Sequence, residues 1–191
     1  MKKVLVPLAQ GFEEIEFVSI VDTLRRAQLD VITASLDSQK SVTGSYQLSI
    51  QADSTISEVK IESLDAICLA GGYKGMQNLS CSAHIIEIIQ KLHIQNKLIC
   101  AICASPIVLY KAGVIKGDFT CYPGCEENIE GTRLNQAVVK NANVITSAGP
   151  STAIIFALEI VKELCGVGVA KDLYEAMVMP LLQAHLNTFA L

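Results

Sequence analysis

Tryptophan is absent from this 191-residue sequence, and aromatic residues account for only 5% of it. Apolar runs of the ~18 residues that a transmembrane helix needs are also absent, which predicts a chain that does not span a membrane and has no membrane partner. The chain contains neither Gly-x-Gly-x-x-Gly nor Gly-Lys-Ser/Thr, although Gly71–Gly75 is rich in glycine. Nucleotide binding is therefore not supported, and the sequence predicts no cofactor.

Positive charge is not in excess either, because 15 Lys and Arg residues against 19 Asp and Glu residues leave a net charge of -4. That balance argues against a nucleic-acid partner. The N-terminal residues contain no signal-peptide cleavage region, so we expect a cytoplasmic protein. In that compartment the seven cysteines, an odd number, are expected to be free thiols and not a disulfide framework.

Hydrophobic residues make up 51% of the chain, which is typical of a globular protein with a large core, and the length predicts one domain over residues 1–191. Apolar runs predict strands at 3–9, 30–36, 65–70, 97–103, 119–122 and 143–147, with extended structure over 42–52. Apolar spacing predicts helices at 13–27, 80–92, 106–112, 151–164 and 172–186. This alternation indicates an α/β fold, in which a mainly parallel sheet carries helices on both faces.

The pattern changes most sharply within residues 97–110. An apolar run ends at Cys103, two small residues follow, and then comes Pro106, which the first turn of a helix tolerates. Cys103 is therefore predicted to lie on a strand-to-helix turn of the nucleophile-elbow type, whose N–H groups favour thiolate over thiol. A reactive cysteine is our first hypothesis. The alternative is that Cys103 is one of several small buried thiols that serve only packing.

Several short motifs occur in an order that resembles the ThiJ/PfpI family, and in particular its branch containing the Parkinson-linked protein deglycase. These motifs are Gly11-Phe12-Glu13-Glu14-Ile15-Glu16, Ala70-Gly71-Gly72, Gln77-Asn78-Leu79-Ser80, Ala101-Ile102-Cys103-Ala104 and Ser147-Ala148-Gly149-Pro150-Ser151-Thr152. The similarity extends over nearly the whole chain. It implies a flavodoxin-like α/β sandwich and a homodimer that packs partly through the first helix.

The resemblance also implies roles for four positions. Cys103 corresponds to the nucleophile, and Glu16 to the carboxylic acid that hydrogen-bonds it. The oxyanion donors correspond to the backbone N–H groups of Gly72 and Ala104. Elementary chemistry is consistent with these roles, because a protonated carboxyl beside a thiolate can stabilise it and move a proton, and two N–H groups can stabilise an oxyanion. Without the resemblance, Glu16 would be interpreted as an exposed carboxylate in the first turn of a helix, and Gly71-Gly72 as a simple turn.

Three departures from the family pattern concern the pocket. Tyr122 stands where a histidine often precedes a proline, and tyrosine, with a reference pKa of ~10, is a poor base at neutral pH. Tyr46 and Ala148 stand where two arginines are common, which removes positive charge. The sequence after Cys103 is Ala-Ser and not the His-Gly of the protease-like members, so peptidase activity is not expected.

Other cysteine arrangements predict less. Cys100 and Cys103 have Cys-x-x-Cys spacing, but three residues of extended strand would hold them ~10 Å apart, too far for a disulfide. Zinc binding by Cys103, Cys121 and Cys125 is not favoured, and His84 and His93 fall on a helix away from the loops, so no metal site is predicted. Cys121 is a hypothetical resolving partner for oxidised Cys103.

Two functions from different classes follow. The first is a cysteine-dependent enzyme of the glyoxalase III or deglycase type, in which Cys103 adds to a 2-oxoaldehyde such as methylglyoxal or to its protein adducts. The second is a redox-sensing, stress-protective chaperone in which Cys103 is oxidised. The missing histidine and arginines weaken both, and we favour the enzyme.

Overall fold

The computed structural model describes residues 1–188. Its main strands are β1 (Lys3–Leu8), β2 (Asp30–Ser35), β5 (Ser54–Thr55), β6 (Ala66–Leu69), β7 (Leu98–Ile102), β10 (Val138–Asn141) and β11 (Val144–Ser147). Two small ladders pair β3 (Ser41–Thr43) with β4 (Ser49–Gln51), and β8 (Asp118–Phe119) with β9 (Thr132–Arg133). The helices are α1 (Glu14–Arg26), α2 (Tyr73–Cys81), α3 (Ala83–Ile94), α4 (Pro106–Lys111), α5 (Ala153–Cys165), α6 (Val167–Ala176) and α7 (Met179–Leu186).

Within residues 1–188, seven strands form one sheet in the order β10-β11-β7-β6-β1-β2-β5. All neighbours in it are parallel except β10 and β11. The strands β6 and β7 are completely buried, as expected for parallel strands covered on both faces. The predicted flavodoxin-like α/β architecture is confirmed, including the strand-to-helix elbow after β7.

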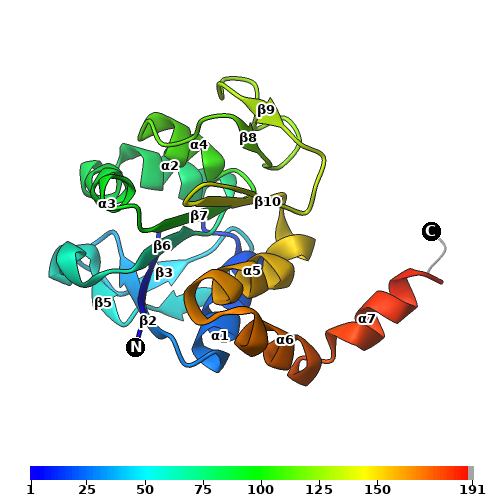
Figure 1. The fold of residues 1–191 in the computed structure, drawn as a ribbon. Helices are drawn as coiled ribbons and strands as arrows, with labels where there is room; N and C mark the ends of the chain where they lie inside the picture. The colour runs from blue at the N-terminus through cyan, green and yellow to red at the C-terminus, as the bar shows by residue number, and fades with distance from the viewer. Residues whose placement is uncertain (189–191) are drawn as a thin grey trace.

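Helices cover the two faces of the sheet in two groups (Figure 1). One core lies under α1, α5 and α6 and includes Phe17, Ile20 and Phe156. The other lies under α2, α3 and α4 and includes Ile85, Ile88 and Leu109. Figure 1 also shows α7 projecting away from the rest of the fold. None of the helices within residues 1–188 combines the length and the hydropathy needed to cross a membrane.

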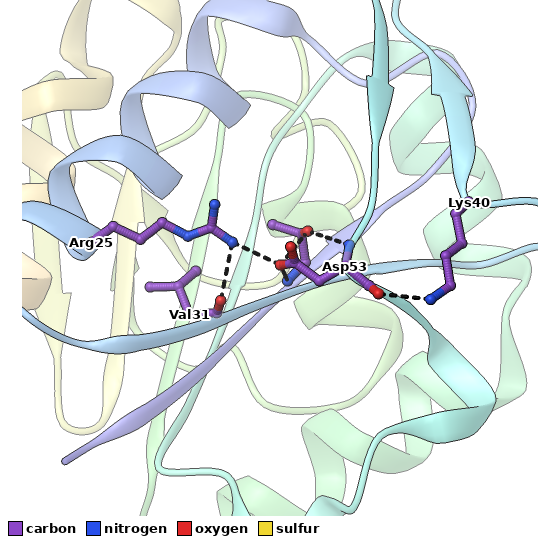
Figure 2. Close-up of polar contacts among 5 residues, drawn as sticks. Arg25, Val31, Lys40 and Asp53 are labelled. Atoms are coloured by element: carbon purple, nitrogen blue, oxygen red, sulfur yellow. Dashed lines mark hydrogen bonds and ion pairs between the residues drawn. The ribbon is translucent and has the colours of Figure 1, made fainter.

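Asp53 makes hydrogen bonds at the β2 edge of the sheet, and Figure 2 shows Arg25 and Lys40 approaching Asp53 from opposite sides. Its carboxylate accepts hydrogen bonds from Arg25 Nη2 at 2.7 Å, from Thr33 Oγ1 at 2.7 Å and from the Thr33 backbone N–H at 3.0 Å. The Asp53 carbonyl accepts from Lys40 Nζ at 2.7 Å. The side chain of Asp53 therefore links α1 to β2 just before β5 begins.

Three predicted elements differ from the structure, and one strand was missed. The helix predicted to begin near Ser80 is two helices, because α2 begins directly after Gly72 and ends at Ser82, whose hydroxyl accepts from the Ile85 N–H and caps α3. The helix predicted at 172–186 is broken at Val178, which has a left-handed φ of 53°. The strand predicted at 119–122 contributes only Phe119, to β8, and the antiparallel strand β10 was not predicted.

Candidate functional site

Three loops at the carboxyl edge of the sheet bring the candidate residues together. Glu16 lies in the first turn of α1, after β1; Gly71 and Gly72 follow β6; and Cys103 follows β7. The strands β1, β6 and β7 are consecutive in the sheet, so their carboxyl ends are adjacent. The helices α1 and α2 leave this edge on opposite faces, which makes the gap between β1 and β6 the switch point where such folds bind ligands.

The Cys103 backbone has a left-handed φ of 63°, as expected for an elbow that turns one side chain out of the sheet. Its N–H donates to the Ser147 carbonyl at 2.9 Å, and its carbonyl accepts from the Tyr122 N–H at 2.9 Å. Pro106 then starts α4, as predicted. Hydrogen bonds on both sides therefore hold the main chain of Cys103 in a conformation that a side chain-bearing residue rarely adopts.

Gly71 allows the Cys103 and Glu16 side chains to approach each other. A Cβ atom added at Gly71 would lie 2.6 Å from the Cys103 Cβ and 2.6 Å from Glu16 Oε2. At Gly72, where φ is 87°, an added Cβ would lie 2.4 Å from the Gly11 carbonyl oxygen. Close packing thus requires glycine at both positions, against the Cys103 and Glu16 side chains at Gly71 and against the backbone of the loop before α1 at Gly72, so the Gly-Gly sequence is more than a simple turn.

Glu16 is completely buried, contrary to the alternative interpretation of an exposed first-turn carboxylate. Its Oε2 accepts the Gly71 N–H at 2.7 Å. Its Oε1 is buried and has no direct hydrogen-bond partner of normal geometry among residues 1–188. Burial raises the pKa of Glu16 to about 7, against the opposing effects of the Gly71 N–H and of Cys103. At neutral pH a large fraction of Glu16 is therefore protonated and able to give a proton to a neighbour.

Burial raises the pKa of the Cys103 thiol to about 12, and the negative charge of ionised Glu16 adds to this effect. The N–H groups of Gly72 and Ala104 act in the opposite direction, because both hydrogen-bond the sulfur. The expectation that the turn by itself favours the thiolate is therefore wrong, because burial outweighs the two N–H groups. Protonation of Glu16 removes the repulsion from its charge, so the thiolate is less disfavoured when Glu16 carries the proton.

The structure places Tyr122 beside the site by its backbone, but its side chain is half exposed, at 51%. The ring packs against Gly149, where an added Cβ would lie 3.3 Å from Tyr122 Cδ2. Tyr46 is exposed, and its backbone N–H donates to Glu14 Oε1 at 2.6 Å. The N–H of Ala148 donates to the Ala137 carbonyl at 3.1 Å. Tyr122 therefore lies at the outer edge of the site, whereas Glu16, Gly72 and Ala104 surround the Cys103 sulfur.

The other cysteines have partners or environments of their own. Cys100 is fully buried beside its register neighbour Cys68 and forms a hydrogen bond with that thiol. Cys121 packs in the core under α2, α3 and α4, whereas Cys103 packs against the opposite core. The Cys121 thiol donates to Glu126 Oε2 at 3.7 Å. The link between Cys103 and Cys121 stays a hypothesis. No group of three His, Cys, Asp or Glu side chains in the described part of the chain is arranged to hold a metal ion.

Glu13 and Glu14 are buried as well, and the sequence interpretation missed their structural importance. Their position in the first turn suggested only a favourable interaction with the helix dipole. Glu13 instead accepts the Glu16 N–H at 2.7 Å, and Glu14 accepts the N–H groups of Tyr46 and Leu48. Glutamate is not among the residues preferred as N-caps, so no sequence signal indicated the cap at Glu13.

Comparison with known proteins gives the same family over most of the chain. The model of the DJ-1/PfpI family matches residues 2–163. The Parkinson disease protein 7 homolog of Danio rerio is 38% identical over 184 residues, which cover 93% of this chain and 97% of that protein. Protein DJ-1 homolog B of Arabidopsis thaliana is 35% identical over 167 residues, 86% of this chain but only 38% of that longer relative.

A solved structure of similar fold is that of oxidised DJ-1 from Toxoplasma gondii. It superposes with a TM-score of 0.87 at 38% sequence identity, covering 93% of this chain and 98% of that one. The family match, the relatives and the fold agree with the resemblance seen in the motifs, and the predicted family is confirmed. This chain belongs to the DJ-1/PfpI family.

Proposed function

We propose that this protein is a glutathione-independent glyoxalase III or protein deglycase that uses Cys103 to attack methylglyoxal-type 2-oxoaldehydes or their adducts on proteins. One observation carries the proposal. The Cys103 sulfur is surrounded by a carboxyl group with a pKa of about 7 and by two backbone N–H groups, those of Gly72 and Ala104. A nucleophile, a proton carrier and oxyanion donors are the components that addition to a carbonyl requires.

The chemistry balances without an external oxidant or reductant. The Cys103 thiolate forms a C–S bond to the aldehyde carbon, and the carbonyl oxygen takes the proton of Glu16 to give a hemithioacetal. Glu16 then removes the proton from that carbon and returns it to the adjacent ketone carbon, while the hydroxyl proton passes to the ketone oxygen. One carbon is thereby oxidised to a thioester carbonyl, and its neighbour is reduced to a hydroxyl-bearing carbon. Water hydrolyses the resulting thioester, which releases a 2-hydroxy acid and restores the thiol. The net change is addition of one water molecule.

The substrate class follows from the charges near the sulfur. Glu16 is the charged group that acts on the Cys103 thiol, and the positions where arginines are common hold Tyr46 and Ala148. An uncharged 2-oxoaldehyde suits this setting better than a substrate with a carboxylate or phosphate group. The half-exposed Tyr122 offers a hydroxyl at the rim that can orient a carbonyl oxygen by hydrogen bonding.

The test is conversion of methylglyoxal to lactate by the purified protein without glutathione. We expect turnover that is lost in Cys103→Ser and reduced by at least about a hundredfold in Glu16→Gln, which keeps an amide acceptor but cannot carry the proton. Cys81→Ser is the control, since Cys81 is an exposed cysteine elsewhere on the surface. Turnover that persists in Cys103→Ser would refute the proposal.

A redox-sensing, stress-protective chaperone is the second candidate, and the same N–H groups favour it. Gly72 and Ala104 would donate to the oxygens of a sulfinic acid on Cys103 as they do to its sulfur. The Toxoplasma gondii relative has been solved in an oxidised form. Mass spectrometry after peroxide treatment should then find two added oxygens on Cys103, together with suppression of client aggregation and no lactate formation. A Cys103–Cys121 disulfide in the same digest would support the resolving role of Cys121.

We also propose a homodimer formed through α1 and the adjoining hairpin of β3 and β4. Ile15, Val18, Tyr46 and Leu48 form an apolar patch whose side chains are between 49% and 76% exposed. Glu14 holds the backbone of the hairpin against α1, so these side chains belong to one surface. An exposed apolar patch of this kind is typical of a protein–protein interface.

A further inference from the structure

Glu13 is a buried carboxylate that the proposed chemistry does not use. Only 7% of its surface is exposed, although it is a charged residue at the start of a helix. Its Oε2 accepts the backbone N–H of Glu16 at 2.7 Å, and its own N–H donates to the Gly71 carbonyl at 3.0 Å. Burying a carboxylate costs free energy, so a surface N-cap such as Ser or Asn would have been the simpler choice if capping were its whole role.

The hydrogen bonds of Glu13 form a closed circuit with the two functional loops. Glu13 Oε2 binds the Glu16 N–H, the Glu16 carboxylate binds the Gly71 N–H at 2.7 Å, and the Gly71 carbonyl binds the Glu13 N–H. Gly72, the next residue, supplies one of the N–H groups on the Cys103 sulfur. Glu13 therefore contacts both loops, binding Glu16 through its side chain and Gly71 through its backbone N–H.

From this circuit we propose that Glu13 is a positioning residue, which holds Glu16 and the Gly71-Gly72 loop around Cys103 and keeps the shared proton on Glu16. The inference rests on the proposed role of Cys103 as the nucleophile. Glu13 does not touch the sulfur and acts through Glu16 and Gly71.

The charges around Glu16 support the second part of the proposal. The titratable groups that act on Glu16 are Glu13 at the start of α1 and Cys103 on the loop after β7. The charge of Glu13 adds to burial in raising the pKa of Glu16. Glu13 is itself shifted, since burial and the neighbouring Glu14 raise its pKa. A negative charge on Glu13 thus disfavours a second negative charge on Glu16. The negative charge that Glu16 and Cys103 share is then left on the Cys103 sulfur.

The experiment compares Glu13→Gln with the wild type and with Glu14→Gln. Glutamine at position 13 retains an oxygen that can accept the Glu16 N–H but removes the charge. The same change at Glu14 removes an equal charge from the same helical turn without a hydrogen bond to Glu16 or Gly71. The readout is the rate of alkylation of Cys103 by iodoacetamide as a function of pH, with the alkylated site identified by mass spectrometry.

In Glu13→Gln we expect the midpoint of Cys103 alkylation to move to higher pH and the rate at pH 7 to fall by about three- to tenfold, because loss of the Glu13 charge lowers the pKa of Glu16. Glu14→Gln should retain the wild-type midpoint. A purely structural cap would lower the melting temperature of Glu13→Gln without moving that midpoint.

The inference is overturned if Glu13→Gln and the wild type share one midpoint, or if both variants move it equally, while Cys103 stays reactive in all three proteins. Those outcomes leave the proposed enzyme intact. If Cys103 of the wild type resists alkylation at every pH, both the inference about Glu13 and the proposed enzyme are overturned, because there is then no nucleophile to position. The two failures are therefore distinguishable.

Discussion

Gly71 determines how closely the thiol and the carboxyl group can approach, because it is the residue packed between them. A methyl group there would meet both side chains at 2.6 Å, well inside van der Waals contact. No flexible side chain can move aside to relieve the overlap, since Cys103 is fixed by its backbone hydrogen bonds and Glu16 is completely buried. The distance between the Cys103 thiol and the Glu16 carboxyl group is therefore set by Gly71, a residue that has no side chain.

Gly71→Ala should therefore separate Glu16 from Cys103, lower turnover by about a hundredfold and destabilise the fold by about 1–3 kcal/mol. Activity assays and urea denaturation measure the two effects. Gly168→Ala is the matched control, because a Cβ there meets no atom of the described chain within 4 Å and lies inside α6. It should raise stability by about 0.5–1 kcal/mol and leave turnover unchanged. Wild-type turnover in Gly71→Ala would contradict the packing argument.

The raised pKa of Glu16 makes stability depend on pH in a specific direction. Below pH 4.5, the ordinary value for this group, Glu16 is protonated in both the folded and the unfolded chain and costs nothing. As pH rises from 4.5 to about 7, the unfolded chain ionises while the folded chain retains the proton. Stability should therefore fall across this window by about 3 kcal/mol on account of Glu16.

Glu16→Gln should remove that contribution, so the free energy of unfolding of the variant relative to the wild type should increase between pH 4.5 and pH 7. Urea titrations at several pH values measure the difference. Glu175→Gln, at an exposed position on α6, should show no such trend. A difference between Glu16→Gln and the wild type that is constant across the window would contradict a buried, protonated Glu16.

At the scale of single residues, the sequence motifs were sufficient to predict which residues meet, but not their protonation. Cys103 was predicted from the end of an apolar run followed by small residues and proline, which are local signals. The burial of Glu13, Glu14 and Glu16 was not predictable in the same way. It depends on the Gly71-Gly72 loop and the β3–β4 hairpin, which reach α1 from distant parts of the chain.

Among the elements, the edge strands depend most on side-chain hydrogen bonds, and β5 is the clearest example. Only two residues of β5 pair with β2, so backbone hydrogen bonds contribute little there. Asp53 adds three hydrogen bonds that cross from its loop to α1 and β2. Partial burial opposes ionisation, but Thr33 and Arg25 together hold the pKa of Asp53 below its usual value.

Asp53→Asn should lower the free energy of unfolding by about 1–2 kcal/mol, a range reduced because half of the Asp53 side chain is exposed. The loss should be present at neutral pH and disappear as pH falls below the ordinary Asp range, because the charged form makes the contacts. Asp22→Asn is the control, since its ion pair with Arg26 is exposed and local to α1. Its effect should stay below about 0.5 kcal/mol in urea denaturation.

The elements also show where sequence patterns are informative. Long apolar runs predicted β1, β2, β6, β7 and β11, because a parallel strand covered on both faces tolerates few polar residues. The strand β10 has only four residues, of which Val139 alone is buried, and its antiparallel pairing depends on the adjacent β11. The break at Val178 lies two residues before Pro180, which is tolerated in the first turn of α7 but not in a helix interior, so a local signal for this break was present and was overlooked.

For the whole molecule, the proposed homodimer rests on the exposed apolar patch on α1 and the hairpin. Ile15→Glu should convert the proposed homodimer to a monomer in light-scattering measurements, because a charge in a paired apolar patch is desolvated without a partner. Ile94→Glu is the control, since Ile94 is 83% exposed at the end of α3, away from this patch. A monomeric wild-type protein, or an Ile15→Glu variant that remains dimeric, would refute the interface.

The main-chain hydrogen bond between Cys103 and Ser147 has a consequence for biosynthesis. The ribosome makes the chain from its N-terminus, so β1, β6, β7 and the thiol emerge long before β11. Until Ser147 is available, the N–H of Cys103 has no acceptor and the elbow lacks one of its two supports. The nascent polypeptide thus carries a cysteine that is not yet held in its final setting. The setting proposed for its chemistry should therefore be complete only after β11 has been translated, although the residue itself is made much earlier.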